Sequence, residues 1–274
     1  MPYLTSTGTA PRTAAAEQFG FGVPGYAHPL LAPTEWDRLT RPGTPLHWAV
    51  LNIDNGPGAR PDPHCLEAAG RLRNARERAL HGEAPDDAVR ASGGRLLGHL
   101  DLDHGNRPFG ELIADAQLFL DWYRVGGFYL ERCPAERAGL PAVRRLTSTL
   151  AALLEDSDTG DGGGRLVLGH GIHPYPGYAE TADQLVTFRG HWTDYRWSQV
   201  AEWTAAYPPG RFAHFVHGVP RTHLDEAMRI ARWQGAGTIF FTDRDGRRGQ
   251  TDPFVALPSY WDEIVSRIGT GISE

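Results

Sequence analysis

The chain has 274 residues, 41% of them hydrophobic, which is enough for a single domain with a sizeable core. Its formal net charge is -6 at pH 7 and its basic residues form no block, so a nucleic-acid-binding surface is not expected. No stretch approaches the roughly 18 apolar residues of a membrane helix, and residues 1–18 lack an apolar run of signal-peptide length. We therefore expect no membrane partner, a cytoplasmic location, and a flexible N-terminal tail over residues 1–18.

Eight short apolar runs follow the tail, and each ends near a polar residue and precedes a helical pattern. The runs are Gly22–His28, His47–Asp54, Arg95–Asp101, Gly127–Glu131, Arg165–His170, Gln184–Arg189, Phe212–His217 and Thr238–Asp243. Eight strand-then-helix units in a chain of this length predict an α/β fold, a single (β/α)8 TIM barrel over residues 19–270. Such barrels carry their chemistry at the C-terminal ends of the strands, so the ends of these runs are the candidate site.

Amphipathic patterns predict the helices between the runs. The clearest are Pro63–Leu80, Phe109–Tyr123, a helix opening at Pro141, Leu224–Gln234 and Pro258–Ile268. Thr222 and Asp225 resemble a capping box, and Gly235 stands where a helix C-terminal glycine belongs. The helices around Thr34–Leu39 and Ala179–Asp183 are short, so we expect a somewhat irregular barrel. The polar loops at residues 82–94 and 156–164 precede strands and belong to the opposite face.

Three carboxylates at strand ends are the candidate catalytic residues. Glu131 closes an aromatic run that faces the barrel mouth, where a carboxyl group can serve as a general acid. The alternative is a structural ion pair with Arg107, Arg132 or Arg189. Asp101 and Asp103 lie on one side if the strand continues, as a paired acid and base require, whereas the alternative is that one of them caps a loop.

A second set of polar residues at or near the strand ends can bind substrate hydroxyl groups. The candidates are Tyr26, His28, Asn52, His99, Arg132, His170, His173, Arg189, His217 and Asp243. His170, His173 and His217 are also possible metal ligands, but hydrogen bonding to neighbours or substrate is the favoured interpretation. Cys65 and Cys133 belong to no CxxC pair and are interpreted as ordinary thiols. We therefore predict no metal and no cofactor.

Six segments in chain order carry a family resemblance. They are residues 22–29 (GVPGYAHP), 51–58 (LNIDNGPG), 97–101 (LGHLD), 122–128 (WYRVGGF), 186–190 (VTFRG) and 257–261 (LPSYW). Together with Trp36 they resemble the spherulation-specific family 4, or spherulin 4-like, proteins over nearly the whole chain. This family is associated with glycoside hydrolase family 135, whose characterised fungal members are TIM barrels that cut α-1,4-linked galactosamine-containing exopolysaccharide.

The resemblance also implies where acidic residues would lie. The family has an Asp-Glu pair at the end of the fourth strand and a Glu at the end of the sixth. Here the pair corresponds to Glu131 and Arg132, and the sixth-strand residue corresponds to Arg189. An arginine stays protonated and serves neither as a general acid nor as a nucleophile, so only one of three carboxylates is kept.

We therefore expect a glycoside-hydrolase-like barrel with altered chemistry, acting on a sugar-like or small polar or anionic molecule. Arg132 and Arg189 would favour an anionic group beside Glu131. Two alternatives remain open: a non-catalytic carbohydrate-binding or regulatory barrel, and a retained glycoside hydrolase that uses Glu131 with Asp101 or Asp103. The sequence specifies neither the substrate nor the oligomeric state.

Overall fold

The computed structural model describes residues 19–25, 27–80, 94–157, 164–246 and 252–269, and in it eight parallel strands close into a barrel. Each strand pairs with the next along the chain, and β8 pairs with β1. The strands are β1 (Gly20–Val23), β2 (Leu46–Leu51), β3 (Arg95–Asp101), β4 (Gly127–Glu131), β5 (Arg165–Gly169), β6 (Gln184–His191), β7 (Phe212–His217) and β8 (Thr238–Phe241). The predicted TIM-barrel fold is thus confirmed.

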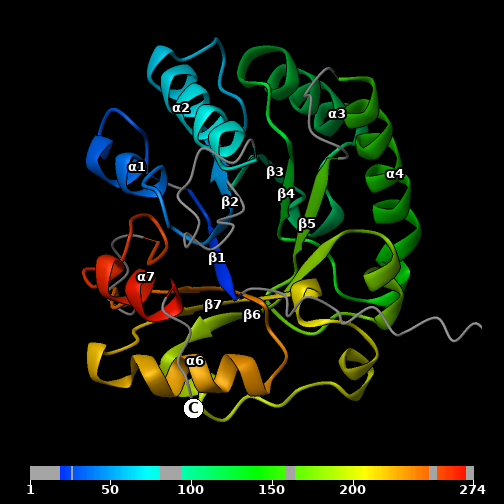
Figure 1. Ribbon diagram of the computed structural model, residues 1–274. Coiled ribbons are helices and arrows are strands. Elements are labelled where there is room, and N and C mark those ends of the chain that lie inside the picture. Colours follow the sequence, from blue (N-terminus) through cyan, green and yellow to red (C-terminus); the bar gives the residue numbers. More distant parts are fainter. Residues whose placement is uncertain (1–18, 26, 81–93, 158–163, 247–251, 270–274) are drawn as a thin grey trace, which may run out of the picture.

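Helices surround the strands, as Figure 1 shows for α1, α2, α3, α4, α6 and α7. The helices are α1 (Pro33–Leu39), α2 (Pro63–Leu80), α3 (Phe109–Leu118), α4 (Leu140–Asp156), α5 (Trp192–Tyr195), α6 (Leu224–Trp233) and α7 (Trp261–Gly269). The predicted helix at Phe109–Tyr123 is α3 followed by a π-helical turn over its last five residues. The short helix after β1 is as expected, whereas after β5 a 3-10 turn at Pro176–Glu180 takes the place of the helix predicted at Ala179–Asp183.

Aromatic side chains fill the barrel interior. Trp48 of β2 stacks on Tyr129 of β4, with 5.9 Å between ring centroids, and also contacts Phe215 of β7. Its indole N–H donates to the Gln184 side chain at 2.7 Å, so this buried polar atom is satisfied. A Cβ at Gly22 would lie 2.4 Å from the Trp48 ring, which explains why β1 carries a glycine there.

Three of the eight strands have the predicted bounds, and the first differs most. The sequence suggested Gly22–His28, whereas β1 spans Gly20–Val23 and is followed by Pro24 and Gly25. Gly25 has φ +70°, and a Cβ there would lie 1.5 Å from the carbonyl oxygen of Val50. This close approach ends the strand, so His28 belongs to a loop.

One predicted helix cap is wrong. His223 occupies the N-cap of α6 and no side chain caps the helix, so Thr222 and Asp225 form no capping box. A 3-10 turn at Arg221–His223 precedes the helix, which shifts Thr222 out of the cap position. Gly235 does follow α6 with φ +75°, as predicted. The predicted tail at residues 1–18 and most of the loops at 82–94 and 156–164 lie outside the described residues.

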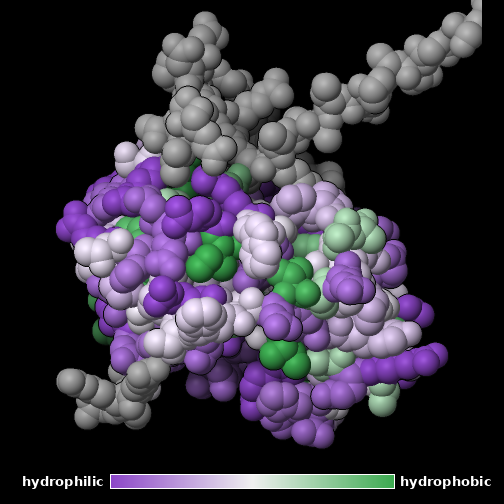
Figure 2. All heavy atoms as spheres, turned by 90° about the horizontal axis from the view of Figure 1, so that it is seen from below, coloured by the Kyte–Doolittle hydropathy of each residue, from purple (hydrophilic) through white to green (hydrophobic). Residues whose placement is uncertain are grey.

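The face in Figure 2 is mostly hydrophilic, with hydrophobic residues in separate patches. Across the helices that the structure describes, none combines the length and the apolar character needed to cross a membrane.

Candidate functional site

Glu131 lies at the barrel mouth, at the last position of β4. Only 13% of its side chain is exposed. One carboxylate oxygen, Oε2, lies 2.7 Å from Nε2 of the fully buried His99, and the other, Oε1, accepts a hydrogen bond from the Arg189 guanidinium. Both oxygens are thus engaged. The ion-pair alternative for Glu131 is the arrangement that the structure shows, with Arg189 as the partner.

Arg189 of β6 connects Glu131 to the loop between β8 and α7. Its Nη2 donates to Oδ2 of Asp252 at 3.1 Å, and its guanidinium carbon lies 5.0 Å from the centre of the Phe254 ring. Two carboxylates and an aromatic face therefore hold this side chain, about a quarter of which is exposed.

Arg132 makes a separate group with Asp101, the last residue of β3, and Asp103, which follows it. It binds Asp101 through two parallel hydrogen bonds, of which Nε to Oδ1 measures 2.8 Å, and its Nη1 lies 2.9 Å from Oδ1 of Asp103. Burial alone raises the pKa of Asp101, but the hydrogen bonds from Arg132 and from the backbone N–H of Asp103 more than offset this, so the pKa lies below its usual value.

The backbone of this group is unusual. Arg132 and Asp103 have φ of 50° and 45°, in the left-handed region that costs a non-glycine residue of order 1 kcal/mol. Asp101 accepts a hydrogen bond from the backbone N–H of Asp103 at 2.9 Å, so it does cap this loop. The predicted pair of carboxylates therefore shares one arginine and one turn.

A wide pocket of about 600 Å³ opens beside Arg132. Its lining comes from the segment after β2, the end of β3 and the segment after it, one residue of α3 and Arg132 after β4, and it is rich in carboxylate, amide and guanidinium groups. The polar side chains that line it are Asp54, Asn55, Asp101, Asp103, Asn106, Arg107, Asp115 and Arg132. Arg107 is itself bound to Asp115. Such a set of donors and acceptors suits a ligand with several hydroxyl groups.

A smaller pocket of about 400 Å³ lies beside Arg189, lined also by His217, Asp252 and Phe254. Burial and the neighbouring His191 lower the pKa of His217. Across the two pockets and Glu131, the described residues provide six carboxylates and three guanidinium groups. The mouth is therefore negatively charged even though it contains three arginines.

Several predicted binding residues lie elsewhere or have other contacts. Asn52 follows β2, and its buried Oδ1 has no hydrogen-bond partner among the residues that the structure describes. Asp243 accepts hydrogen bonds from the backbone and side chain of Ser259, so it caps the turn before α7. His28 contacts Asp62 rather than the Glu131 group. Tyr26 lies outside the described residues.

The two histidines after β5 pack against aromatic rings. His170 lies edge-on to Tyr178, at 4.8 Å between ring centroids, and burial lowers its pKa to about 4. The ring centroids of His173 and Trp203 lie 6.5 Å apart, and burial lowers the pKa of His173 as well. His170, His173 and His217 do not form one metal-binding group among the described residues, whereas His217 lies beside His191 and Asp245.

Sequence reasoning missed Asp252 and Phe254, which hold Arg189, and it missed Asp115 of the wide pocket. Asp252 and Phe254 belong to the segment after β8, more than sixty residues from Arg189 in the chain. No local pattern marks them. Asp115 lies within an amphipathic helix, where a carboxylate on the polar face is ordinary.

Comparisons with known proteins agree with this architecture. The sequence model of the spherulation-specific family 4 matches residues 21–268. The crystal structure of Aspergillus clavatus Sph3 in complex with GalNAc is similar to this chain with a TM-score of 0.72 and 22% identity. The similarity covers 92% of this chain and 98% of that one. A search of curated protein sequences finds no match.

Proposed function

Because the chain belongs to the spherulation-specific family 4, we propose that its barrel mouth binds a saccharide in the wide pocket beside Arg132. We propose further that the site does not cleave glycosidic bonds by the usual pair of carboxylates. The observation that carries this second part is that Glu131 and Asp101 are each bound to an arginine.

The size and chemistry of the wide pocket support the first part. A volume of about 600 Å³ is ample for a short oligosaccharide segment, and the lining offers both hydrogen-bond acceptors and donors. The similar structure of Sph3 was determined in complex with GalNAc. A sugar in this pocket would contact Asp103, whose side chain is half exposed and therefore accessible to a ligand.

The charge of the mouth favours a neutral sugar or an amino sugar over an anionic ligand. Arg132 and Arg189 each already contact two carboxylates, so neither has a guanidinium edge reserved for an incoming anion. An anion would also meet the excess of carboxylates around these arginines. A protonated amino group would instead be attracted. The structure thus supports the sugar-like part of our expectation more than the anionic part.

The contacts of Glu131 support the second part. A general acid must present a proton to the glycosidic oxygen, and a nucleophile must present a free lone pair to the sugar ring. Glu131 presents one oxygen to Arg189 and the other to His99, so both point at protein groups. Asp101 is turned toward Arg132 in the same way. We propose that these carboxylates position arginines and ligand hydroxyls.

The proposal is tested by calorimetric titration with GalNAc and with α-1,4-linked galactosamine oligosaccharides, alongside a reducing-end assay. We expect binding without release of reducing ends. Asp103→Ala should weaken binding about fivefold, since one sugar hydrogen bond contributes on the order of 1 kcal/mol. Asp225→Ala is the matched control, because Asp225 is an exposed carboxylate on α6 that pairs with Arg267.

Two results would contradict the proposal. Reducing ends that appear with the wild type and disappear with Glu131→Gln would restore the two-carboxylate hydrolase. Tighter binding of a uronic acid than of GalNAc would show that the arginines, and not the carboxylates, set the ligand charge.

A further inference from the structure

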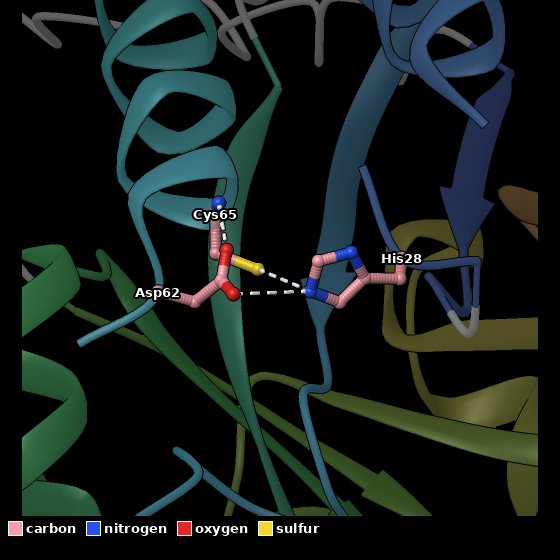
Figure 3. Close-up of side chains that lie close together, drawn as sticks. All are labelled: His28, Asp62 and Cys65. Carbon is pink, nitrogen blue, oxygen red and sulfur yellow. Dashed lines mark hydrogen bonds and ion pairs between the residues drawn. The ribbon is translucent and has the colours of Figure 1, made fainter. Parts of the chain in front are cut away.

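A second cluster of chemically active side chains lies apart from Glu131, where the loop after β1 meets the start of α2. Figure 3 shows His28, Asp62 and Cys65 pointing toward one another. Nε2 of His28 lies 3.5 Å from Oδ2 of Asp62 and 3.6 Å from Sγ of Cys65. Cys65 is fully buried, and His28 and Asp62 are each about one-quarter exposed.

Both contacts end on the same ring nitrogen of His28, which separates this cluster from a nucleophilic triad. In a Cys–His–Asp triad the two ring nitrogens have different partners, one facing the nucleophile and the other the carboxylate. Here the other nitrogen, Nδ1, accepts a hydrogen bond from the backbone N–H of Leu30 at 3.2 Å. Burial also raises the pKa of Cys65 to about 12, so the sulfur is a protonated thiol and a poor nucleophile at neutral pH.

The spacing of the three atoms matches a tetrahedral metal site. Zinc binds sulfur at about 2.3 Å and nitrogen or oxygen at about 2.0 Å, so the tetrahedral edges measure about 3.5 Å for sulfur to nitrogen and about 3.3 Å for nitrogen to oxygen. The observed separations are 3.6 Å for Sγ to Nε2 and 3.5 Å for Nε2 to Oδ2, and Sγ lies within 4.8 Å of a carboxylate oxygen of Asp62. We propose that His28 Nε2, Asp62 Oδ2 and Cys65 Sγ bind a zinc ion, with a fourth position open to water.

The chemistry of the donors favours zinc over other common cations. Thiolate and imidazole are ligands that zinc prefers, whereas magnesium and calcium prefer oxygen. When zinc binds, Cys65 releases its thiol proton to solvent, and the resulting thiolate and the Asp62 carboxylate balance the two charges of the ion, which suits a partly buried site. The proton that His28 carries on Nε2 lies where the ion would sit. Zinc would replace it, and the ring would then carry its proton on Nδ1, so the contact with Leu30 would break.

Other contacts already fix two of the ligands. Oδ1 of Asp62 accepts hydrogen bonds from the backbone N–H groups of His64 and Cys65 at 2.9 and 3.0 Å, so it caps α2 and leaves Oδ2 facing His28. The backbone N–H of Asp62 donates to the Tyr123 hydroxyl, which donates to the carbonyl of Pro57 in the lining of the wide pocket. Zinc would therefore join the loop after β1 to the start of α2. The start of α2 is in turn connected through Tyr123 to the loop after β2 that lines the wide pocket.

A second candidate group, His191, His217 and Asp245, has weaker grounds. Its ligand atoms are also close together, but it contains no thiol and Asp245 is half exposed. Nδ1 of His191 accepts the N-cap hydrogen bond of α5 from the backbone of Thr193. This group serves as the control in the test.

The test is a titration of the full chain, after chelator treatment, with Zn²⁺ followed by calorimetry and with Co²⁺ followed by absorption. We expect one zinc ion per chain, a higher melting temperature, and cobalt spectra with tetrahedral ligand-field bands and a thiolate charge-transfer band. Cys65→Ala and His28→Gln should each weaken zinc binding by roughly a hundredfold or more, since even supporting residues around a metal contribute ten- to a hundredfold. His28→Gln alters a partly exposed loop residue, so it tests the site even if Cys65→Ala fails to fold.

Cys133→Ala and His217→Gln are the matched controls and should bind zinc like the wild type. Cys133 is the other buried thiol of the chain. The proposal is overturned if the wild type binds no zinc, if cobalt produces no thiolate band, or if His217→Gln abolishes binding while His28→Gln leaves it intact. Since saccharide binding is measured separately, its failure would leave this result unaffected.

Discussion

The barrel mouth contains two arginine groups that differ in how firmly they are held. Arg189 is bound by Glu131 and Asp252 and covered by Phe254, and its carboxylate Glu131 also contacts the buried His99. Arg132 is bound by Asp101 and Asp103 at the edge of the wide pocket, with nearly half of its side chain exposed.

The two arginines have different consequences for the barrel mouth. A charge pair shielded from water is costly to break, because the partner left behind is an uncompensated buried charge. A pair in which one partner is nearly half in water, as Arg132 is beside the buried Asp101, is screened more strongly and remains accessible to a ligand. The Arg189 group therefore stabilises the mouth, and the Arg132 group shapes a polar pocket.

The largest expected effect is that of Arg189→Ala. This change removes the guanidinium that binds Oε1 of the largely buried Glu131, so we expect the free energy of unfolding to fall by about 2 to 3 kcal/mol. Denaturant unfolding measures it. Arg196→Ala is the matched control, since Arg196 forms an exposed pair with Glu226, and it should cost less than about 1 kcal/mol. If Arg189→Ala and Arg196→Ala lower the free energy of unfolding equally, the Arg189 group does not stabilise the fold more than an exposed ion pair does.

Arg132→Ala should reduce the free energy of unfolding by only about 1 kcal/mol, because much of its guanidinium is in water. Arg132→Ala should lower the saccharide affinity, measured by calorimetry, more than Arg189→Ala does. If Arg189→Ala weakens saccharide binding while Arg132→Ala does not, the Arg189 group and not the Arg132 group contributes to the binding site.

The Asp101–Arg132 pair should make the free energy of unfolding depend on pH in the acid range. The folded pKa of Asp101 lies below its usual value, so as pH falls the unfolded chain binds the proton first. The stabilisation is complete above the unfolded pKa of about 4 and is lost as pH falls through the folded pKa. Between pH 7 and about pH 3, the free energy of unfolding should fall less in Asp101→Asn than in the wild type. The difference should be smaller than about 1 kcal/mol, because nearly half of the arginine side chain is exposed to solvent. Parallel losses would show that the pair does not stabilise the fold.

The smallest effect separates the backbone of Arg132 from its charge. Because residue 132 has φ of 50°, Arg132→Gly should be more stable than Arg132→Ala by about 0.5 to 1 kcal/mol, although both remove the guanidinium. Chemical unfolding of the two variants provides the measurement. If Gly proves less stable than Ala, residue 132 does not keep its left-handed conformation.

The sequence predicted the barrel well because each strand is a local apolar run. The bounds of β3, β4 and β7 are as predicted, since each run ends on the last paired residue. The β1 prediction was displaced because Gly25 packs against the backbone of Val50, a contact that no local pattern encodes.

The candidate site was predictable only where strand ends define it. His99, Glu131 and Arg189 meet because β3, β4 and β6 place their C-terminal ends at one mouth. Which partner each charge takes depends on loops, so Asp252 could not be assigned from its surroundings in the sequence. The same holds for the proposed zinc cluster, since His28 comes from the loop after β1 and Cys65 from the start of α2.

The proposed function is tested most directly by a crystal structure of the full chain grown with an α-1,4-linked galactosamine oligosaccharide. We predict an intact sugar in the wide pocket, in contact with Asp103 and Arg132, while Arg189 stays bound to Glu131 and Asp252. A cleaved sugar over Glu131, with Arg189 displaced from it, would contradict the proposal.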